Sequence, residues 1–438
     1  MKKAFPQRLA LLCGVMVLLV FLAVLAGNSR VCALDKDTYR SLKVFTQVLD
    51  LVEKNYVEPV SAQTLLQGAI SGVMKTLDPH SAFMTPEMYK ELEVETTGSF
   101  GGIGIEISLQ KDILTVVTPI EDTPAFDAGV LAGDQIIKID GKSTKDMTIT
   151  EAIEKLRGPE NTQVTITILR EGLTRPKDIT ITRKIIKINS VKTRVYDGNI
   201  GYIRISAFQE RTADDLKRLL KEMMNKTKPL TGIVIDLRNN GGGLLPQSIE
   251  VSDVFLKEGT IVAIRGRTTS MSSQAVAHND GIEPTCPLVV LVNEATASAA
   301  EIVSGALQDN RRALLVGTKT FGKGSVQTVI PLEDGAALKL TTAKYYTPSG
   351  RCIQAEGIMP DVIVRATKAS EEIAPTEERP REKDLEGHIK AEDEEEGEPQ
   401  RPQTLRKKED DDLARDNQLK SAVDILKSWQ IFQKVIKS

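Results

Sequence analysis

The chain has 438 residues, more than one ordinary hydrophobic core accommodates, so we expect two or more folded units. Hydrophobic residues make up 41% of the sequence, which supports globular domains, and 57 basic against 60 acidic residues leave a net charge of -3. Because no basic excess is available to hold phosphates, nucleic-acid binding is excluded as the main function.

The N-terminal segment indicates export. Lys2, Lys3 and Arg8 precede an apolar run over residues 9–26, and residues 31–33 supply small side chains at which a signal peptidase can cut. We therefore expect a signal peptide or signal anchor over residues 1–33. The apolar run is also long enough to stay in a membrane, so the sequence leaves cleavage open.

Residues 34–95 are expected to be a helical region. Apolar residues recur at intervals of three and four from residue 39 to residue 56, and a second helical stretch covers residues 62–77 and ends at Asp78. Two amphipathic helices are too few for a core of their own. They are therefore expected to pack on another domain or on a second subunit.

The sequence pattern changes over residues 96–185, where it predicts a β-rich domain with short helices. Short apolar runs alternate there with Gly, Pro and Asp turns. The expected strands are 103–107, 113–117, 135–139 and 164–169, and the expected helices lie near 123–128 and 150–156.

Residues 186–367 alternate between strand and helix patterns, which predicts an α/β domain. The run 232–237 is nearly all apolar, as expected of a strand buried on both faces. The other strands are expected at 200–206, 260–264, 288–292, 313–316, 325–331 and 339–346, and the helices at 213–224, from Pro246 and after Ser298.

The C-terminal part divides in two. Residues 368–412 are rich in Glu, Lys, Arg and Pro and almost devoid of apolar residues, which predicts a disordered charged linker. Residues 413–438 regain helical periodicity, so a C-terminal helix is expected there.

Histidine and cysteine limit the chemistry. None of the three histidines, His80, His278 and His388, has the sequence surroundings of a catalytic base, so neither a Ser-His-Asp enzyme nor a multi-histidine metal site is expected. Cys286 and Cys352 belong to the folded body. An oxidising compartment would allow them to pair, and two separate buried thiols are at least as compatible with the sequence.

Ser298 is the candidate nucleophile. It follows an apolar strand, lies among small residues and precedes a helix, where the helix dipole favours developing negative charge. A serine here is also a common helix cap, and alone the segment favours that role. Asp309 lies eleven residues further along the same helix, about 16 Å away, and is interpreted as structural.

Two further segments favour catalysis. Three glycines, 241–243, follow the buried strand, and consecutive glycines usually serve a close backbone approach or offer free N–H groups. Lys323 lies between two glycines at the start of a strand, with Gln327 expected on the same face to orient its amine. Lys319 is the rival candidate for this lysine. A lysine that acts as a base must be neutral, so the pKa of its amine must fall from about 10.4 toward neutrality.

Together these segments closely resemble the carboxy-terminal processing proteases, also called tail-specific proteases. The resemblance implies that Ser298, in T-A-S-A-A-E, is the nucleophile, that Lys323, in F-G-K-G, is the general base, and that Gln327 positions the lysine. It further implies an oxyanion hole made by backbone N–H groups of Ala299 and of Gly242 or an adjacent glycine. The core is expected to be a crotonase-like β/α spiral.

The β-rich segment resembles a PDZ domain inserted into this core. Its glycine-rich turn, with Gly102, Ile103, Gly104 and Ile105, matches a loop whose backbone N–H groups capture a terminal carboxylate while the tail adds as a strand. Arg157 matches an arginine that in some relatives couples the PDZ domain to protease activity. A solvated or salt-bridged arginine is the alternative.

The flanking segments 77–81 and 418–432 also resemble the family. The resemblance runs from about residue 38 to residue 365 and resumes near residue 413. The charged linker has no counterpart, and Cys352 replaces an expected serine in a G-R-x-I-Q motif.

The sequence thus predicts an exported serine endopeptidase, in the periplasm or at the outer face of the inner membrane, that selects proteins by their C-terminal tails. We expect no metal, cofactor or nucleic acid, a homodimer through the terminal helices, and room for a regulatory partner and a membrane anchor. The alternatives are a catalytically inactive PDZ adaptor and an acyl-CoA enzyme on a crotonase-like fold.

Overall fold

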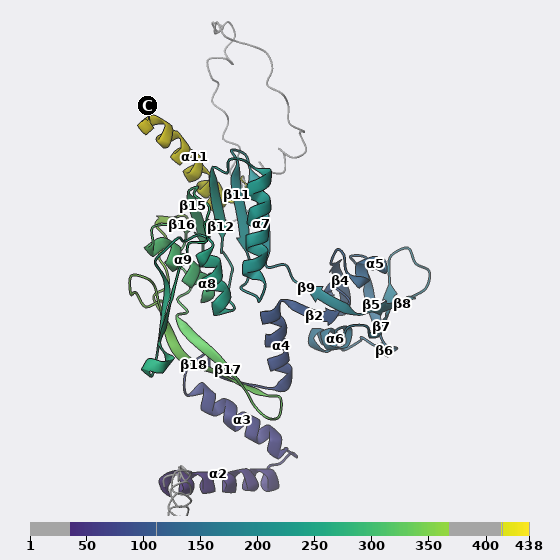
Figure 1. Cartoon of the computed structure of the whole chain (residues 1–438). Helices are drawn as coiled ribbons and strands as arrows, with labels where there is room; N and C mark the ends of the chain where they lie inside the picture. The colour runs from purple at the N-terminus through teal and green to yellow at the C-terminus, as the bar shows by residue number, and fades with distance from the viewer. Residues whose placement is uncertain (1–35, 111, 368–412, 414, 438) are drawn as a thin grey trace, which may run out of the picture. The chain divides into compact units, whose positions relative to one another are not determined.

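The computed structural model describes residues 36–110, 112–367, 413 and 415–437 (Figure 1). The signal segment expected over 1–33 and the linker expected over 368–412 lie outside the described residues. Within the described ranges, no helix is long and apolar enough to cross a membrane. The chain divides into two units, residues 1–77 and 78–438, and the helical region expected over residues 34–95 spans the boundary between them.

The first unit contains the two helices that the sequence predicts, α2 (Lys36–Asn55) and α3 (Ala62–Lys75). Helix α3 begins at Ser61, whose hydroxyl accepts a hydrogen bond from the N–H of Thr64 at 3.1 Å. Helix α2 contacts α3 but has no buried residue, so its apolar stripe is largely exposed.

The second unit begins with β1 (Ala82–Met84), which the sequence did not predict, and α4 (Pro86–Thr97), most of which lies in the helical region expected over residues 34–95. Strand β1 pairs with β18 (Ala337–Tyr346). The antiparallel sheet has the order β1-β18-β13-β14, with β17 paired to β18. Its other members are β13 (Thr260–Gly266), β14 (Ser273–Val276) and β17 (Ser325–Pro331), and the 3₁₀ helix η1 (Thr269–Met271) lies between β13 and β14 along the chain.

The β-rich segment forms its own sheet, ordered β3-β4-β5-β7-β8 with β6 beside β5. Strands β2 and β9 pair with each other, and neither they nor β8 were predicted from the sequence. The bounds are β2 (Ser99–Gly102), β3 (Ile105–Gln110), β4 (Ile113–Pro119), α5 (Pro124–Asp127), β5 (Gln135–Ile139), β6 (Lys142–Ser143), α6 (Ile149–Leu156), β7 (Gln163–Leu169), β8 (Lys177–Thr182) and β9 (Lys184–Lys187).

A second, six-stranded sheet forms the centre of the α/β domain. Its order is β10-β11-β12-β15-β16-β19, and all neighbours are parallel except the pair β10–β11. The strands are β10 (Val191–Tyr196), β11 (Ile200–Ile205), β12 (Gly232–Asp236), β15 (Leu288–Val292), β16 (Ala313–Gly317) and β19 (Val362–Ile363). All residues of β12 and β15 are buried, as their apolar runs predict.

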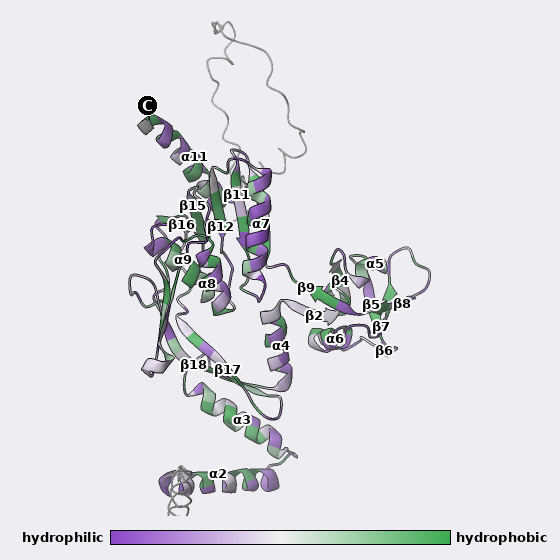
Figure 2. Ribbon diagram, viewed as in Figure 1, coloured by the Kyte–Doolittle hydropathy of each residue, from purple (hydrophilic) through white to green (hydrophobic). Residues whose placement is uncertain are grey.

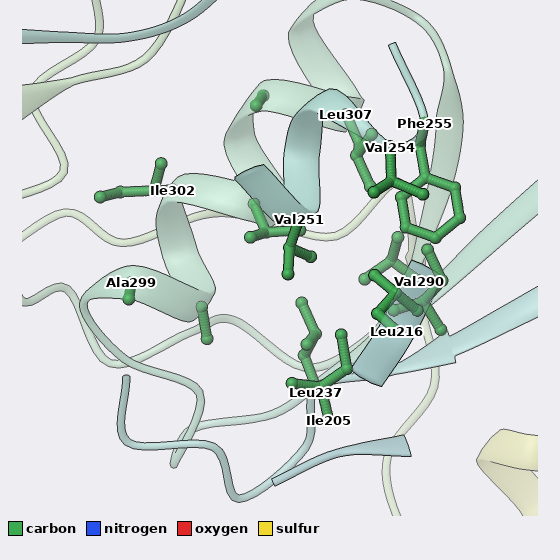
Figure 3. Packing of buried hydrophobic residues seen from close by; sticks show 14 of the residues in the cluster. Ile205, Leu216, Leu237, Val251, Val254, Phe255, Val290, Ala299, Ile302 and Leu307 are labelled. Carbon is green, nitrogen blue, oxygen red and sulfur yellow. The ribbon is translucent and has the colours of Figure 1, made fainter. Parts of the chain in front are cut away.

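Helices cover both faces of this sheet. On one face, α7 (Thr212–Lys226), α8 (Leu245–Asp253) and α9 (Ala299–Asp309) enclose the main core, where Figure 3 shows Val251 of α8 and Ile302 of α9 among the buried side chains. The other face packs against α11 (Asn417–Lys437), which confirms the expected C-terminal helix. The part of α7 turned to the viewer in Figure 2 is largely hydrophilic, in keeping with its surface position. The mixed α/β core agrees with the sequence, and the crotonase-like spiral stays a prediction.

Candidate active site

Ser298 lies between β15 and α9 in a backbone conformation that an ordinary helix cap does not adopt. A cap residue is normally extended, whereas Ser298 has φ 55° and ψ -117°. Non-glycine residues in such conformations are strained and concentrate at functional sites. The side chain is 8% exposed. The backbone therefore distinguishes Ser298 from the simple cap that the sequence also allowed.

The glycine loop lies directly against Ser298. A Cβ added at Gly242 would lie 2.8 Å from the Cβ of Ser298 and 3.0 Å from the nitrogen of Ala299, and φ of Gly242 is 104°. A Cβ at Gly243 would lie 2.3 Å from the carbonyl oxygen of Phe208, whereas one at Gly241 would meet nothing within 4 Å. The close approach expected of these glycines is thus required at two of the three positions.

Hydrogen bonds join this loop to the segment before Ser298. The N–H of Ala297 donates to the carbonyl of Asn240 at 2.9 Å, and the N–H of Gly242 donates to the side-chain oxygen of Asn240 at 2.8 Å. The N–H of Gly242, an expected oxyanion donor, is therefore already engaged. The N–H of Ala299 has no hydrogen-bond partner among the described residues.

Lys323 lies in the loop before β17 and is half-buried, whereas its rival Lys319 is exposed. Burial lowers the pKa of Lys323, the charge of Lys339 lowers it further, and the carboxylate of Glu301 acts in the opposite direction. Within the described part of the chain, the amine of Lys323 has no hydrogen-bond partner. The surroundings thus make this amine easier to deprotonate than an ordinary lysine, which is the direction that a general base requires.

Glu301 connects the two candidate residues. One carboxylate oxygen, Oε2, accepts the backbone N–H of Ser298 at 2.8 Å and that of Lys323 at 2.9 Å. The other, Oε1, accepts the hydroxyl of Thr320 at 2.5 Å and the N–H of Gly322 at 2.7 Å. The side chain is 0% exposed, and burial raises its pKa against the effect of these four donors. The backbones of Ser298 and Lys323 are therefore held by a single atom.

Sequence reasoning did not assign Glu301 to the site. The signal available was the spacing S-x-x-E at the start of α9, which is typical of a capping box. The glutamate does accept the backbone N–H of Ser298. Its bonds to the loop of Lys323 have no counterpart in that local motif.

Gln327 is joined to the start of the second unit. Its amide nitrogen donates to Ser325 at 2.8 Å and to the hydroxyl of Thr341 at 3.4 Å, and the hydroxyl of Thr341 donates to Asp78 at 3.2 Å. No hydrogen bond of the described residues joins Gln327 to Lys323, so the orienting role of Gln327 stays a prediction. Burial lowers the pKa of His80, and the charge of Lys323 contributes, which indicates that this histidine lies within electrostatic reach of Lys323.

A groove in the β-rich domain contains the expected carboxylate-binding loop. It has a volume of about 390 Å³. The carbonyls of Ile103 and Gly104 accept the N–H groups of Ala125 and Ile120, but their own N–H groups have no partner among the described residues. The groove is lined by Phe100, Gly102, Ile103, Gly104, Ile105, Glu106, Ile107, Val117, Ile153, Leu156 and Arg157.

The remaining candidates have the following surroundings. The guanidinium carbon of Arg157 lies 4.7 Å from the centroid of the Phe100 ring, a cation–π contact at the groove. Asp309 ends α9 and binds the N–H of Ser349 and the side chain of Arg351, in keeping with a structural role. Both Cys286 and Cys352 are free thiols.

Three family models match the chain. Peptidase family S41 matches residues 199–364, a PDZ domain matches residues 115–170, and the activating protease CtpB N-terminal domain matches residues 27–88. A carboxy-terminal-processing protease of Bartonella bacilliformis is 44% identical over 362 residues, covering 82% of this chain and 83% of that protein. The carboxyl-terminal-processing protease of a Synechocystis species is 39% identical over 325 residues, covering 72% of this chain and 74% of that protein.

Among solved structures, the photosystem II D1 C-terminal processing protease is 31% identical, with a TM-score of 0.43, and the match covers 74% of this chain and 92% of that one. The matches define a serine-type peptidase that carries a PDZ domain. The chain belongs to peptidase family S41, among the carboxy-terminal processing proteases.

Proposed function

We propose that this peptidase is an exported endopeptidase that cleaves proteins selected by their C-terminal tails, with Ser298 as nucleophile and Lys323 as general base. The observation that carries the proposal is the buried carboxylate of Glu301, one oxygen of which binds the backbone N–H groups of both residues. The lowered pKa of Lys323 and the strained backbone of Ser298 support the same assignment.

The proposed reaction is acyl transfer. The Oγ of Ser298 attacks the peptide carbonyl while the amine of Lys323 takes its proton, and the resulting ammonium protonates the leaving amine. Water, deprotonated by Lys323, then hydrolyses the acyl-enzyme. The oxygen of Gln327 would accept an N–H of the Lys323 amine, because its amide nitrogen is already used on Ser325 and Thr341.

For the oxyanion, the proposed donors are the N–H of Ala299 and that of a glycine adjacent to Gly242. The free N–H of Ala299 at the first position of α9 supports its part. Because the N–H of Gly242 already donates to Asn240, Gly241 and Gly243 are the stronger candidates for the second donor.

The tail would bind in the PDZ groove. Its terminal carboxylate would accept the unpaired N–H groups of Ile103 and Gly104, and its strand would pair with β3. The groove side chains Ile107, Val117 and Ile153 favour an apolar last residue. Arg157 stays the candidate that couples tail binding to catalysis.

We expect amidation of a substrate's C-terminus to lower kcat/KM by roughly tenfold to a hundredfold, because the hydrogen bonds to a charged carboxylate are lost. The change should appear mainly as a higher KM. The measurement compares two peptides that differ only in this amide. Ile107→Asp should lower kcat/KM for the free-acid peptide by a similar factor, because the new carboxylate repels the terminal carboxylate. Leu109→Asp, on the same strand outside the groove, should not lower it. Equal cleavage of acid and amide would argue against tail selection.

The pH dependence should reveal the lysine base. Because the neutral amine is active, kcat/KM should rise with pH through the pKa of Lys323, and the lowered pKa places that rise at a lower pH than for an ordinary lysine. Lys339→Met removes a neighbouring cation, so the rise should move to higher pH. Lys344→Met, an exposed lysine of the same strand, is the control and should leave the profile unchanged. An unshifted profile in Lys339→Met would contradict this electrostatic role.

Export to the periplasm, or retention at the outer face of the inner membrane, is proposed from the N-terminal segment alone.

A homodimer is proposed from the apolar side chains left exposed on the terminal helices. Examples are Tyr39 and Leu51 on α2, 67% and 59% exposed, and Phe432 on α11, 63% exposed. Light scattering of the purified protein would test the dimer.

A further inference from the structure

The C-terminal helix is packed on the sheet that leads into the active site. Along β12, Ile233 and Ile235 point into the core under α7, α8 and α9, whereas Val234 belongs to the cluster under α11. Strand alternation places Asp236, the last residue of β12, on the α11 face as well. Four buried residues of α11 cover this face, Leu419, Ala422, Val423 and Leu426, and Ile425 packs against them.

Asp236 is the centre of a buried ionic cluster at this face. It is 1% exposed, and its carboxylate accepts Arg204 at 2.9 Å, Tyr202 at 2.8 Å and the guanidinium of Arg238 at 2.7 and 3.0 Å. Its pKa is lowered despite its burial, chiefly by the bonds from Arg238. A buried carboxylate with these partners fixes the orientation of Arg238.

The other side of the Arg238 guanidinium is held by the C-terminal segment. Its two terminal nitrogens bind the two oxygens of Asp416 at 2.8 and 2.7 Å, a bidentate pair, and one also donates to Gln418 at 3.1 Å. Asp416 additionally accepts the N–H of Leu419 at 2.9 Å, at the start of α11. Arg238 is therefore clamped between β12 and the beginning of α11.

Arg238 also lies in the segment that leads from β12 into the glycine loop, residues 241–243. The backbone N–H of the next residue, Asn239, donates to the side-chain oxygen of Asn293 at 2.9 Å. The side-chain oxygen of Asn239 in turn accepts a hydrogen bond from the amide nitrogen of Asn293 at 2.8 Å. The following residue, Asn240, accepts the N–H of Ala297 at 2.9 Å. The clamp thus lies at the root of the loop that contacts Ser298.

We infer that Asp416 is a positioning residue for catalysis, which through Arg238 fixes the glycine loop against Ser298. Docking of α11 therefore sets the geometry of the acylation site, although α11 follows the protease core only after the charged stretch 368–412. This inference rests on the proposed roles of Ser298 and Lys323. A purely structural Asp416 would stabilise the fold without changing the activity of each folded molecule.

The test measures three quantities in the full-length protein: the rate of labelling by a fluorophosphonate, kcat and KM for a tail-bearing peptide, and Tm. Asp416→Asn keeps the shape and removes the charge, and should slow labelling and lower kcat per titrated site by roughly tenfold, with KM unchanged. Asp416→Glu should recover most of the rate. Asp424→Asn, an exposed position on the same helix, is the control and should match the unaltered protein.

Arg238→Lys is the second variant, because lysine cannot make the bidentate pair with Asp416, and it should show the same loss of kcat. A lower Tm with unchanged kcat per titrated site in both variants would overturn the inference and leave the proposed function intact. Failure of the unaltered protein to cleave the peptide would overturn the proposed function itself, and this inference with it.

Discussion

Ser298→Ala and Lys323→Met should each lower kcat/KM for a tail-bearing peptide by roughly four orders of magnitude or more, because each removes one half of a unit that acts together. For the same reason, the double variant should lose little beyond either single variant. The binding constant of a tail peptide should not change, since the groove that holds it contains neither residue. Turnover and tail binding would be measured on the same preparations.

The control for the lysine is Lys319→Met, which removes an exposed lysine four residues away in the same loop. It should leave kcat/KM unchanged. Strict additivity of the two active-site losses would contradict a shared proton transfer. Cleavage that persisted equally in Ser298→Ala would instead support an inactive adaptor contaminated by another protease.

The elements that the sequence predicts well are those whose burial leaves a long continuous signal. Strands β12 and β15 are buried on both faces and are apolar almost throughout, and α7 carries a clear helical stripe. Strand β1 has three residues and β19 two, too few for any periodicity. They exist because β18 and β16 supply their hydrogen-bonding partners from elsewhere in the chain.

The site residues likewise include some that short local motifs reveal and others whose role depends on contacts between distant segments. Ser298 and Lys323 lie in short motifs that could be recognised, but Glu301 acquires its role only when the loop with Lys323 returns to the start of α9. Arg238 and Asp416 are 178 residues apart, so no local pattern joins them. The donor function expected of Gly242 also depended on geometry, because Asn240 takes up its N–H from two residues away.

Glu301→Gln should be the most damaging conservative change outside the reacting pair. Each carboxylate oxygen accepts two hydrogen bonds, and the pair on Oε2 comes from the N–H groups of Ser298 and Lys323. Glutamine has the same shape but presents an NH₂ group in place of one oxygen, so two of the buried donors would face another donor. The free energy of unfolding should fall by roughly 2–6 kcal/mol, at about 1–3 kcal/mol for each unpaired group.

Activity should fall with stability but not in proportion to it. Because Glu301 holds the backbones of Ser298 and Lys323 together, its loss separates nucleophile and base, and kcat per folded molecule should fall by about a hundredfold. Urea unfolding gives the stability, and turnover corrected for active-site titration gives kcat. Glu250→Gln, an exposed change on α8, should cost less than about 0.5 kcal/mol and leave turnover unchanged. A Glu301→Gln protein with normal kcat would show that the alignment of Ser298 and Lys323 does not depend on this carboxylate.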